Sequence, residues 1–405
     1  MKKKIVFGLI TTSNDYYRGF QHNEQLYKEI IKNFGSFLIL DLSNLLLGRK
    51  VKQKKRRNNL PKKIKIFKPK NGKELISYFN EKKFIGFNNI GKTFSFFKIY
   101  FFLNKINFDQ IFILNFGYLD NVNTVDFTKF NNFLYSNLNF ILRKLSKYIF
   151  RVFSLINFFP QIEYYFDSSL PTINNIKNSW QKKIDSRFNI NISFFKNAHL
   201  INSKPYDYVQ SFKKKLNEKY IVFIDTDFNH GDRVIREGKI NNQEKNQYQN
   251  HTLKLFKYLE KKLKKKVVIC LHPKNNDKNF QVFFKNYEIK KFKTEFYIKN
   301  AFLVLFHTSS AIMSATLLDK KILSVKSRLL GNYLSNLTDL NNKQLGTKSI
   351  YLKDKYNFIN KGFFKSFKKN KNSRNKYVRN YLNSDGITPG YIKVVKILKR
   401  RYFRI

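Results

Sequence analysis

Cysteine is almost absent from this chain of 405 residues. Cys270 is the only one, so no intramolecular disulfide can form. It lies in the apolar run 267–271, where a thiol packs as a small buried side chain. We therefore expect an inert, buried cysteine.

Long uncharged apolar runs are absent too. A membrane-spanning helix needs roughly 18 or more apolar residues. Lys98 interrupts the run 94–103, and four basic residues interrupt the run 133–159. The apolar run 5–10 is too short for a secretory signal and leads into polar residues. These patterns predict a cytoplasmic protein, either soluble or peripheral at the inner membrane face.

Acidic residues are scarce, with 27 Asp and Glu against 79 Lys and Arg and a net charge of +52. Such an excess attracts phosphate, nucleic acid or anionic lipid. However, Lys, Asn, Ile, Phe and Tyr share A/T-rich codons and are all abundant, so coding bias explains much of a uniform excess. Only local clusters then carry functional weight. No aromatic–basic recognition pattern is present, so nucleic acid is not the favoured partner.

Apolar residues, in contrast, are plentiful. Hydrophobic residues make up 42% and aromatic residues 17%, which excludes a disordered chain. The length predicts two domains. Short apolar strands alternate with helices in both halves, which predicts an α/β fold with two Rossmann-like domains facing a cleft. The expected boundaries are 1–212 for an N-terminal acceptor-side domain, 217–385 for a C-terminal nucleotide-binding domain, and 386–405 for a helix that packs back on the N-terminal domain.

The expected elements follow from hydrophobic periodicity. In the N-terminal half we expect strands at 5–10, 37–40, 110–115, 162–166 and 198–201, and helices at 24–34, in the second part of 84–103, and at 130–158. In the C-terminal half we expect strands at 220–224, 267–271, 287–290, 302–306 and 322–325, and helices at 248–263, 294–300, 309–318 and 392–398.

Residues 49–70 break this rhythm. About every second residue there is Lys or Arg and none is acidic. Such a run is either a solvated surface loop or a patch for acidic partners, of which an anionic membrane surface is one. The expected helix 130–158 has an aromatic–aliphatic face and a basic face, which fits core packing or, alternatively, a membrane surface.

Polar residues with functional chemistry follow the expected C-terminal strands. In parallel sheets, ligands bind where the carboxyl ends of strands meet helix N-termini. After the strand 220–224 comes a loop with three carboxylates and an imidazole, which could bond ribose hydroxyls or supply a base; a polar turn is the alternative. The ligand spacing of a metal site is missing. The loop residues are Asp225, Thr226, Asp227, His230 and Asp232.

His272, Pro273 and Lys274 follow the strand 267–271. Pro273 stops the strand and fixes the backbone, so we expect the His272 imidazole to face the cleft, where it can donate to a phosphate or protonate a leaving phosphate. A lone His-Pro pair is a weak signal, but its place directly after a buried strand strengthens it.

His307, Thr308, Ser309 and Ser310 follow the strand 302–306 and open an expected helix. Hydroxyls and free N–H groups at a helix N-terminus suit a phosphate, although serine is also an ordinary N-cap. We expect Thr294 to cap the short helix before this strand and Lys293 to reach a phosphate, unless it is simply solvated.

These paired motifs resemble those of bacterial sialyltransferases and related capsule-sugar transferases of the GT-B fold. In that group a His-Pro motif and a Ser-Ser/Thr motif bind the nucleotide of a CMP-activated sugar. The resemblance implies the same role for His272-Pro273 and Ser309-Ser310. Glycerophosphotransferases that use CDP-glycerol are similar. The resemblance covers residues 220–330. The acidic-acidic-Gly motif that supplies the base has no Gly after Asp227, so Asp225, Asp227 and Asp15 are rival candidates for the base.

The resemblance and the loop residues together predict a glycosyltransferase that moves a sugar from a nucleotide-activated donor to a surface polysaccharide or lipid-linked acceptor, with no metal or other cofactor. One alternative is a CDP-activated polyol-phosphate transferase. Another is a non-catalytic protein that binds nucleotide or nucleic acid.

Overall fold

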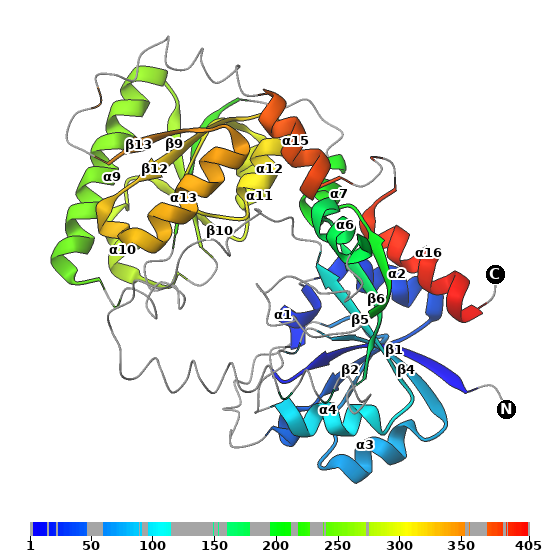
Figure 1. The fold of residues 1–405 in the computed structure, drawn as a ribbon. Helices are drawn as coiled ribbons and strands as arrows, with labels where there is room; N and C mark the ends of the chain where they lie inside the picture. The colour runs from blue at the N-terminus through cyan, green and yellow to red at the C-terminus, as the bar shows by residue number, and fades with distance from the viewer. Residues whose placement is uncertain are drawn as a thin grey trace. The chain divides into compact units, whose positions relative to one another are not determined.

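The computed structural model describes residues 3–13, 16–21, 23–46, 60–88, 90, 96–114, 149, 153, 160–178, 195–211, 218–226, 238, 240–272, 275–352, 356, 371–383, 386 and 388–403. They divide into two compact units (Figure 1). The first unit holds the described residues up to Asn202 and from Gly386 onward. The second holds those from Ser203 to Asn383. Each unit is a parallel sheet flanked by helices.

The sheet of the first unit has the strand order β3-β2-β1-β4-β5-β6-β7, with every described pair parallel. Its strands are β1 (Lys4–Thr11), β2 (Phe37–Asp41), β3 (Ile64–Phe67), β4 (Lys82–Asn88), β5 (Phe108–Leu114), β6 (Ile162–Asp167) and β7 (Phe195–Leu200). Its helices are α1 (Tyr16–Gln21), α2 (Glu24–Phe34), η1 (Ser43–Leu45), α3 (Gly72–Phe79), α4 (Phe97–Asn104), α6 (Leu170–Asn178) and α16 (Gly390–Phe403).

Helix α2 shows why the first βαβ unit was predictable. Its apolar residues recur at helical spacing, and Leu26 and Ile30 are buried in the core. Gly35 ends the helix with φ 86°, and its N–H donates to the carbonyl of Ile31 at 2.9 Å. Glycine accepts this left-handed conformation without a steric penalty. The expected helix 24–34 is confirmed.

Two strands of this sheet escaped the sequence analysis. β3 lies inside the basic stretch 49–70, for which a solvated loop and a patch for acidic partners were both expected, and it pairs in parallel with β2. It has four residues, and Lys65 and Ile66 in its middle are both exposed, as suits an edge strand. The lysines around it hide the strand pattern. β4 occupies the first part of the run assigned to 84–103. Residues 49–59 and most of the expected helix 130–158 lie outside the described residues.

The second unit has the strand order β10-β9-β8-β11-β12-β13, again parallel throughout the described pairs. Its strands are β8 (Tyr220–Ile224), β9 (Lys266–Leu271), β10 (Glu288–Lys291), β11 (Ala301–Phe306), β12 (Lys321–Lys326) and β13 (Lys348–Tyr351). Its helices are α7 (Lys204–Gln210), α9 (Asn242–Leu263), α10 (Lys278–Phe283), α11 (Thr294–Lys299), α12 (Ile312–Leu317), η6 (Arg328–Leu330), α13 (Gly331–Leu345) and α15 (Lys371–Tyr381).

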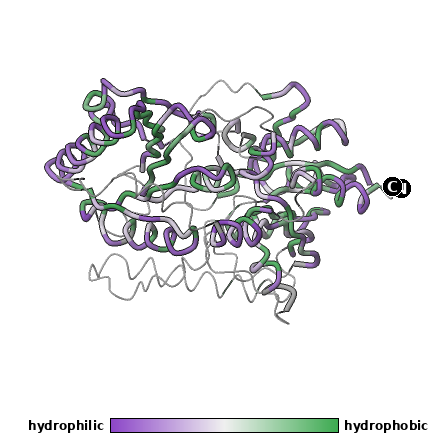
Figure 2. Tube along the Cα trace, turned by 90° about the horizontal axis from the view of Figure 1, so that it is seen from above, coloured by the Kyte–Doolittle hydropathy of each residue, from purple (hydrophilic) through white to green (hydrophobic). Residues whose placement is uncertain are grey.

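Both faces of this second sheet are buried. Along β8, Ile221 and Phe223 pack into one core with α9, while Val222 and Ile224 pack into another with α12 and α15. Continuous apolar strands between helices are what a doubly covered parallel sheet requires. Figure 2 shows hydrophobic stretches, in green, alternating with hydrophilic ones along the trace. Cys270 lies in the second core, and burial raises the pKa of its thiol to about 12. The expected buried, inert cysteine is confirmed.

Helix ends were the weakest part of the sequence analysis. α9 begins at Asn242, six residues before the expected start at 248, because its first turns are polar and show no apolar period. Asn241 and Glu244 form a capping box there. Conversely, α12 begins at Ile312 and not at 309. α7 begins after Ser203, whose hydroxyl accepts from the Tyr206 N–H.

The last helix belongs to the first unit. Val394 and Leu398 of α16 share a core with Leu26 and Ile30 of α2. Across the described part of the chain, no helix is both long enough and apolar enough to span a bilayer.

Candidate functional site at the carboxyl edge of the second sheet

The strand order of the second unit marks one position on its sheet. Counted along the chain, the strands lie in the order third, second, first, fourth, fifth, sixth. The direction of winding therefore reverses between β8 and β11, and the helices that follow them, α9 and α12, pack on opposite faces. Open α/β sheets bind ligands at such a switch point, beyond the carboxyl ends of the strands. The loops at 225–226 and 307–310 flank it.

Asp225 connects two loops at this edge of the sheet. It follows β8, is 2% exposed, and its Oδ2 accepts a hydrogen bond from Asn275 Nδ2 at 2.7 Å and one from the His272 N–H at 3.3 Å. Hydrogen bonds to a buried carboxylate are among the strong ones. These bonds place the Asp225 carboxylate beneath the loop that follows β9. Its predicted role as a base or a ribose ligand stays a prediction.

The turn at His272 is fixed from a second side. The Asn275 N–H donates to the His272 carbonyl at 2.9 Å, which closes the turn. Lys291, at the end of β10, donates from Nζ to the Asn275 carbonyl and to Asn276 Oδ1, both at 2.8 Å. The structure thus brings His272 next to Asp225, as the strand-end argument predicted.

The serine turn lies on the other side of the switch point. The Thr226 hydroxyl donates to the Thr308 carbonyl at 3.4 Å, which links the loops that follow β8 and β11. Ser309 is half-buried and its Oγ accepts from the Ala311 N–H at 3.3 Å, whereas Ser310 is exposed. Both serines precede α12, so they belong to a turn and do not form the first helical residues. The N–H groups of Ala311, Ile312 and Met313 already donate to the two serines, so the serine hydroxyls are the groups that can donate hydrogen bonds to an anion.

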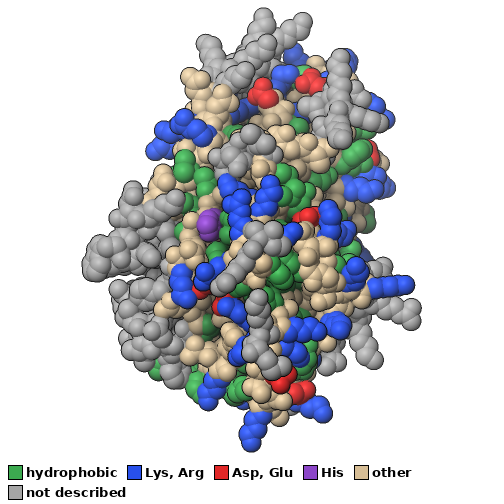
Figure 3. Space-filling model, turned by 90° about the vertical axis from the view of Figure 1, so that its right-hand side faces the viewer, with side chains coloured by type: hydrophobic (Ala, Val, Ile, Leu, Met, Phe, Trp, Pro, Cys, Tyr) green, Lys and Arg blue, Asp and Glu red, His purple; other side chains and the backbone are tan. Residues whose placement is uncertain are grey.

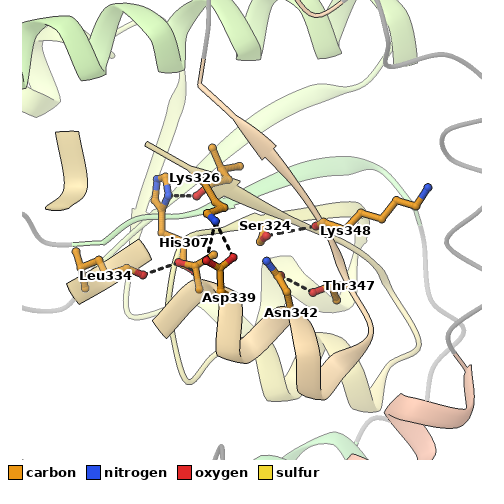
Figure 4. Close-up of polar contacts among 10 residues, drawn as sticks. His307, Ser324, Lys326, Leu334, Asp339, Asn342, Thr347 and Lys348 are labelled. Carbon is orange, nitrogen blue, oxygen red and sulfur yellow. Dashed lines mark hydrogen bonds and ion pairs between the residues drawn. The ribbon is translucent and has the colours of Figure 1, made fainter. Parts of the chain in front are cut away.

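His307 lies in the core and not on the surface of the site. It is 0% exposed, and its two ring nitrogens contact the Val325 carbonyl and the Tyr248 hydroxyl, the latter at 2.5 Å (Figure 4 shows the Nδ1 contact). A carbonyl can only accept, so Nδ1 carries the hydrogen and Nε2 accepts from Tyr248. Burial lowers the pKa of His307 to about 4 despite the hydrogen bond to Val325. The His307 ring therefore packs beneath the serine turn, and its predicted contact with nucleotide stays a prediction.

Thr338 reinforces this support. Its hydroxyl donates to the His307 carbonyl at 2.8 Å and lies in the middle of α13. α13 therefore braces the end of β11. The sequence analysis did not identify α13, because its polar residues dilute the apolar spacing.

Lys326 is a site residue that the sequence analysis missed. It ends β12, its side chain is 10% exposed, and Nζ lies 2.6 and 2.7 Å from the two carboxylate oxygens of Asp339 (Figure 4). Its ammonium also lies 5.0 Å from the ring centre of Tyr351. Burial by itself lowers the pKa of Lys326, but the bonds to Asp339 and Tyr351 outweigh it and the net shift is upward. A lysine closing an apolar strand was the signal available in the sequence.

The segment after β10 departs from prediction in one detail. Lys293 occupies the cap position of α11 with no side-chain cap bond, and Thr294 is the first helical residue, so Thr294 is not the cap. The Lys293 side chain is exposed. Six predicted site residues lie outside the described residues: Asp15, Asp227, His230, Asp232, Pro273 and Lys274.

The first unit has a polar cluster of its own at the ends of β2 and β3. Asp41 is 0% exposed and accepts from the Tyr16 hydroxyl at 2.6 Å and the Ser43 N–H at 2.9 Å, with Lys68 Nζ at 3.4 Å. Burial and the nearby carboxylate raise the pKa of Tyr16. Within the described ranges of either unit, no group of three His, Cys, Asp or Glu side chains is placed to hold a metal ion.

Solved structures share this architecture. The wall teichoic acid polymerase TagF matches with a TM-score of 0.51 and 10% sequence identity, over 99% of this chain and 90% of the other. A variant of TagF soaked with CDPG matches with a TM-score of 0.50 and 8% identity, over 100% and 90% of the two chains. The chain has a fold of the GT-B type. A UDP-GlcNAc 2-epimerase from Methanocaldococcus jannaschii, with a TM-score of 0.44 and 14% identity over 98% and 99% of the chains, adds nothing to this assignment.

In sequence, no family model matches the chain and no curated protein matches it significantly. The resemblance noted from the His-Pro and Ser-Ser motifs is therefore confirmed for the fold, while its sialyltransferase part has no support from a sequence match. At 8 to 10% identity, the likeness to TagF concerns the fold alone.

Proposed function

We propose that the chain is a glycosyltransferase of the GT-B type, which moves a sugar from a nucleotide-activated donor, CMP-linked in the first instance, to a surface polysaccharide or lipid-linked acceptor. One observation carries the proposal. The switch point of the second sheet is flanked by the His272 turn and the serine turn, both fixed by hydrogen bonds to their neighbours. Preorganised donors at such an edge stabilise phosphate charge at no reorganisation cost.

In this proposal each group has a distinct role. His272 donates to the donor phosphate and protonates the leaving nucleotide, and Ser309 and Ser310 bind phosphate oxygens. Asp225 holds the His272 turn in place. Because protein donors neutralise the leaving charge, transfer requires no metal ion. The base that activates the acceptor is Asp225, Asp227 or Asp15, and kinetics of the three Asn variants at saturating donor distinguish them.

The test begins with nucleotide binding. Melting of the purified chain is followed with CMP, CDP, UDP and GDP, and the best ligand is titrated by calorimetry. The proposal expects at least one nucleotide to raise the melting temperature, because a ligand that binds only the folded state stabilises it. His272→Ala should weaken binding and abolish turnover, whereas His251→Ala, on the partly exposed face of α9, should change neither. Full activity of His272→Ala, or loss of turnover with a chelator, contradicts the assigned roles.

A polyol-phosphate transferase with a CDP-activated donor is the second candidate. It is favoured by the fold shared with TagF, one of whose structures was soaked with CDPG. The two reactions differ in the bond that breaks. A CMP-sugar loses its sugar through a carbon–oxygen bond, whereas CDP-glycerol releases CMP when glycerol phosphate moves to the acceptor. Phosphorus NMR of the products distinguishes them, because only the second reaction transfers phosphorus to the acceptor.

Nucleotide binding with no turnover on any donor would instead support a non-catalytic protein. Retention of a nucleic acid probe at physiological salt, with no nucleotide binding, would favour the nucleic-acid alternative that the charge suggests.

We also propose that the enzyme acts at an anionic membrane surface through the basic stretch 49–70. Lys62, Lys63 and Lys65 are exposed on or beside the edge strand β3. Figure 3 shows one face on which Lys and Arg are widespread and Asp and Glu are few. Each basic residue near anionic lipid contributes about 1 kcal/mol. Gln at these three positions should reduce co-sedimentation with phosphatidylglycerol vesicles. Equal pelleting, or pelleting indifferent to salt, contradicts the proposal.

A further inference from the structure

Phe292 is unusual in two ways: its aromatic side chain is exposed and its backbone has a positive φ. It is the first residue after β10, its relative exposure is 74%, and its φ is +64°. The other described non-glycine residues with positive φ are Lys264 and Asp319, and each follows the end of a helix. The left-handed conformation is common there. Phe292 has no such reason, because it follows a strand.

Neither packing nor folding explains this arrangement. A bulky side chain in the left-handed region is a steric outlier that costs stability. An aromatic ring that stays largely in water recovers little of that cost through burial. Strained residues that surrounding structure holds in place concentrate at ligand sites. An exposed ring on a strained backbone therefore indicates a ligand that covers the ring.

The surroundings of Phe292 connect it to the site of the proposed function. Lys291 pairs in register with Leu271, so Phe292 and His272 are the first residues beyond two adjacent strands. Lys291 Nζ lies 5.6 Å from the centre of the Phe292 ring and also bonds the Asn275 carbonyl. Through these contacts the ring lies beside the turn that Asp225 holds.

The spacing of the strands fits a nucleotide. The switch point lies between β8 and β11, so the end of β10 is two and a half strand spacings from it, which corresponds to about 12 Å. An extended nucleotide spans a distance of this order from the far edge of its base to its phosphate oxygens. With phosphate at the switch point between β8 and β11, the base then comes to lie over the end of β10.

We propose that Phe292 is the stacking surface for the nucleobase of the donor nucleotide. The proposal rests on the proposed function, since it needs a nucleotide at this edge. Every base has a π face, so stacking supplies affinity without selecting one base. The positive φ at Phe292 is retained because it presents the ring to the ligand. A ring that inserts into a lipid surface among Lys290, Lys291 and Lys293 is the competing explanation.

The experiment separates the base from the rest of the nucleotide. Calorimetry measures CMP, CDP, UDP, GDP and ribose 5-phosphate against the wild type, Phe292→Ala and Phe292→Tyr. Phe292→Ala should weaken nucleotide binding roughly five- to a hundredfold, the range for loss of one stacked base. Ribose 5-phosphate should bind both proteins equally, and Phe292→Tyr should retain the wild-type affinity for nucleotide. Val282→Ala, which removes another exposed apolar side chain of this unit, is the matched control and should change nothing.

Phe292→Gly adds a signature that a structural role would not give. Glycine adopts positive φ freely, so this variant should melt at or above the wild-type temperature and yet bind nucleotide as weakly as Phe292→Ala. Equal nucleotide affinity of wild type and Phe292→Ala overturns the inference alone. So does an equal loss for nucleotide and ribose 5-phosphate, or a loss confined to binding of phosphatidylglycerol vesicles. If the wild type binds no nucleotide, the proposed function fails and the inference fails with it.

Discussion

The neutral state of His307 leads to a prediction about stability and pH. The ring is 0% exposed, and its folded-state pKa is about 4 against an ordinary value of 6.5. Between these two values the unfolded chain binds a proton that the folded chain does not. Stability is therefore full above pH 6.5, falls as the pH drops, and levels off below about 4. The lost contribution is roughly 3 kcal/mol, because each unit of pKa shift corresponds to about 1.4 kcal/mol.

The assay compares wild type with His307→Gln by urea unfolding, followed by circular dichroism, at several values between pH 4 and 8. Hydrogen exchange of β11 and β12 reports on the second unit alone. His307→Gln should be less stable at pH 8, because the contacts to Tyr248 and Val325 are altered, but the difference should shrink by about 3 kcal/mol as the pH falls to 4. Carboxylates such as Asp277 titrate in both proteins and cancel. A difference between wild type and His307→Gln that is constant from pH 4 to 8 would refute the buried neutral imidazole.

Three further predictions concern the same sheet edge. Asp225→Ala leaves the donors that it binds without their acceptor in a buried place, so urea unfolding should show a loss of roughly 2 to 4 kcal/mol; a loss under 1 kcal/mol contradicts its positioning role. Replacing Ser309 and Ser310 with Ala should weaken nucleotide binding, measured by calorimetry, by roughly 1 to 3 kcal/mol and should change the melting temperature little. Unchanged affinity would mean that the two serines only form the turn. Asp339→Ala should destabilise the protein more than Lys326→Met, because it leaves the buried Lys326 ammonium without its partner, whereas in Lys326→Met the 55% exposed Asp339 carboxylate can be hydrated. The reverse order of melting temperatures contradicts this prediction.

Strong periodicity made the core elements predictable. The helix 24–34 and the strand 220–224 have the bounds expected from their apolar patterns. A strand that is buried on both faces is apolar along its length, so it can be recognised in the sequence as a short apolar run. Elements with mixed faces were missed, among them β3, whose single lysine, Lys65, is exposed, and α13, whose Thr338 bonds the carbonyl of His307 beyond β11. Their stability comes from partners far away in sequence.

The sequence by itself determined the α/β class, the buried Cys270, and the polar residues that follow each strand, because local periodicity and strand ends are written in neighbouring residues. Only the tertiary structure decided where each polar side chain lies. It placed the Asp225 carboxylate beneath the His272 turn and the His307 ring in the core. These positions depend on bonds to residues 50 and 59 positions away along the chain, Asn275 for Asp225 and Tyr248 for His307. The apolar pattern along the chain determines which side chains follow a strand at the edge of the sheet. Packing between elements distant in the sequence determines which of those side chains are buried.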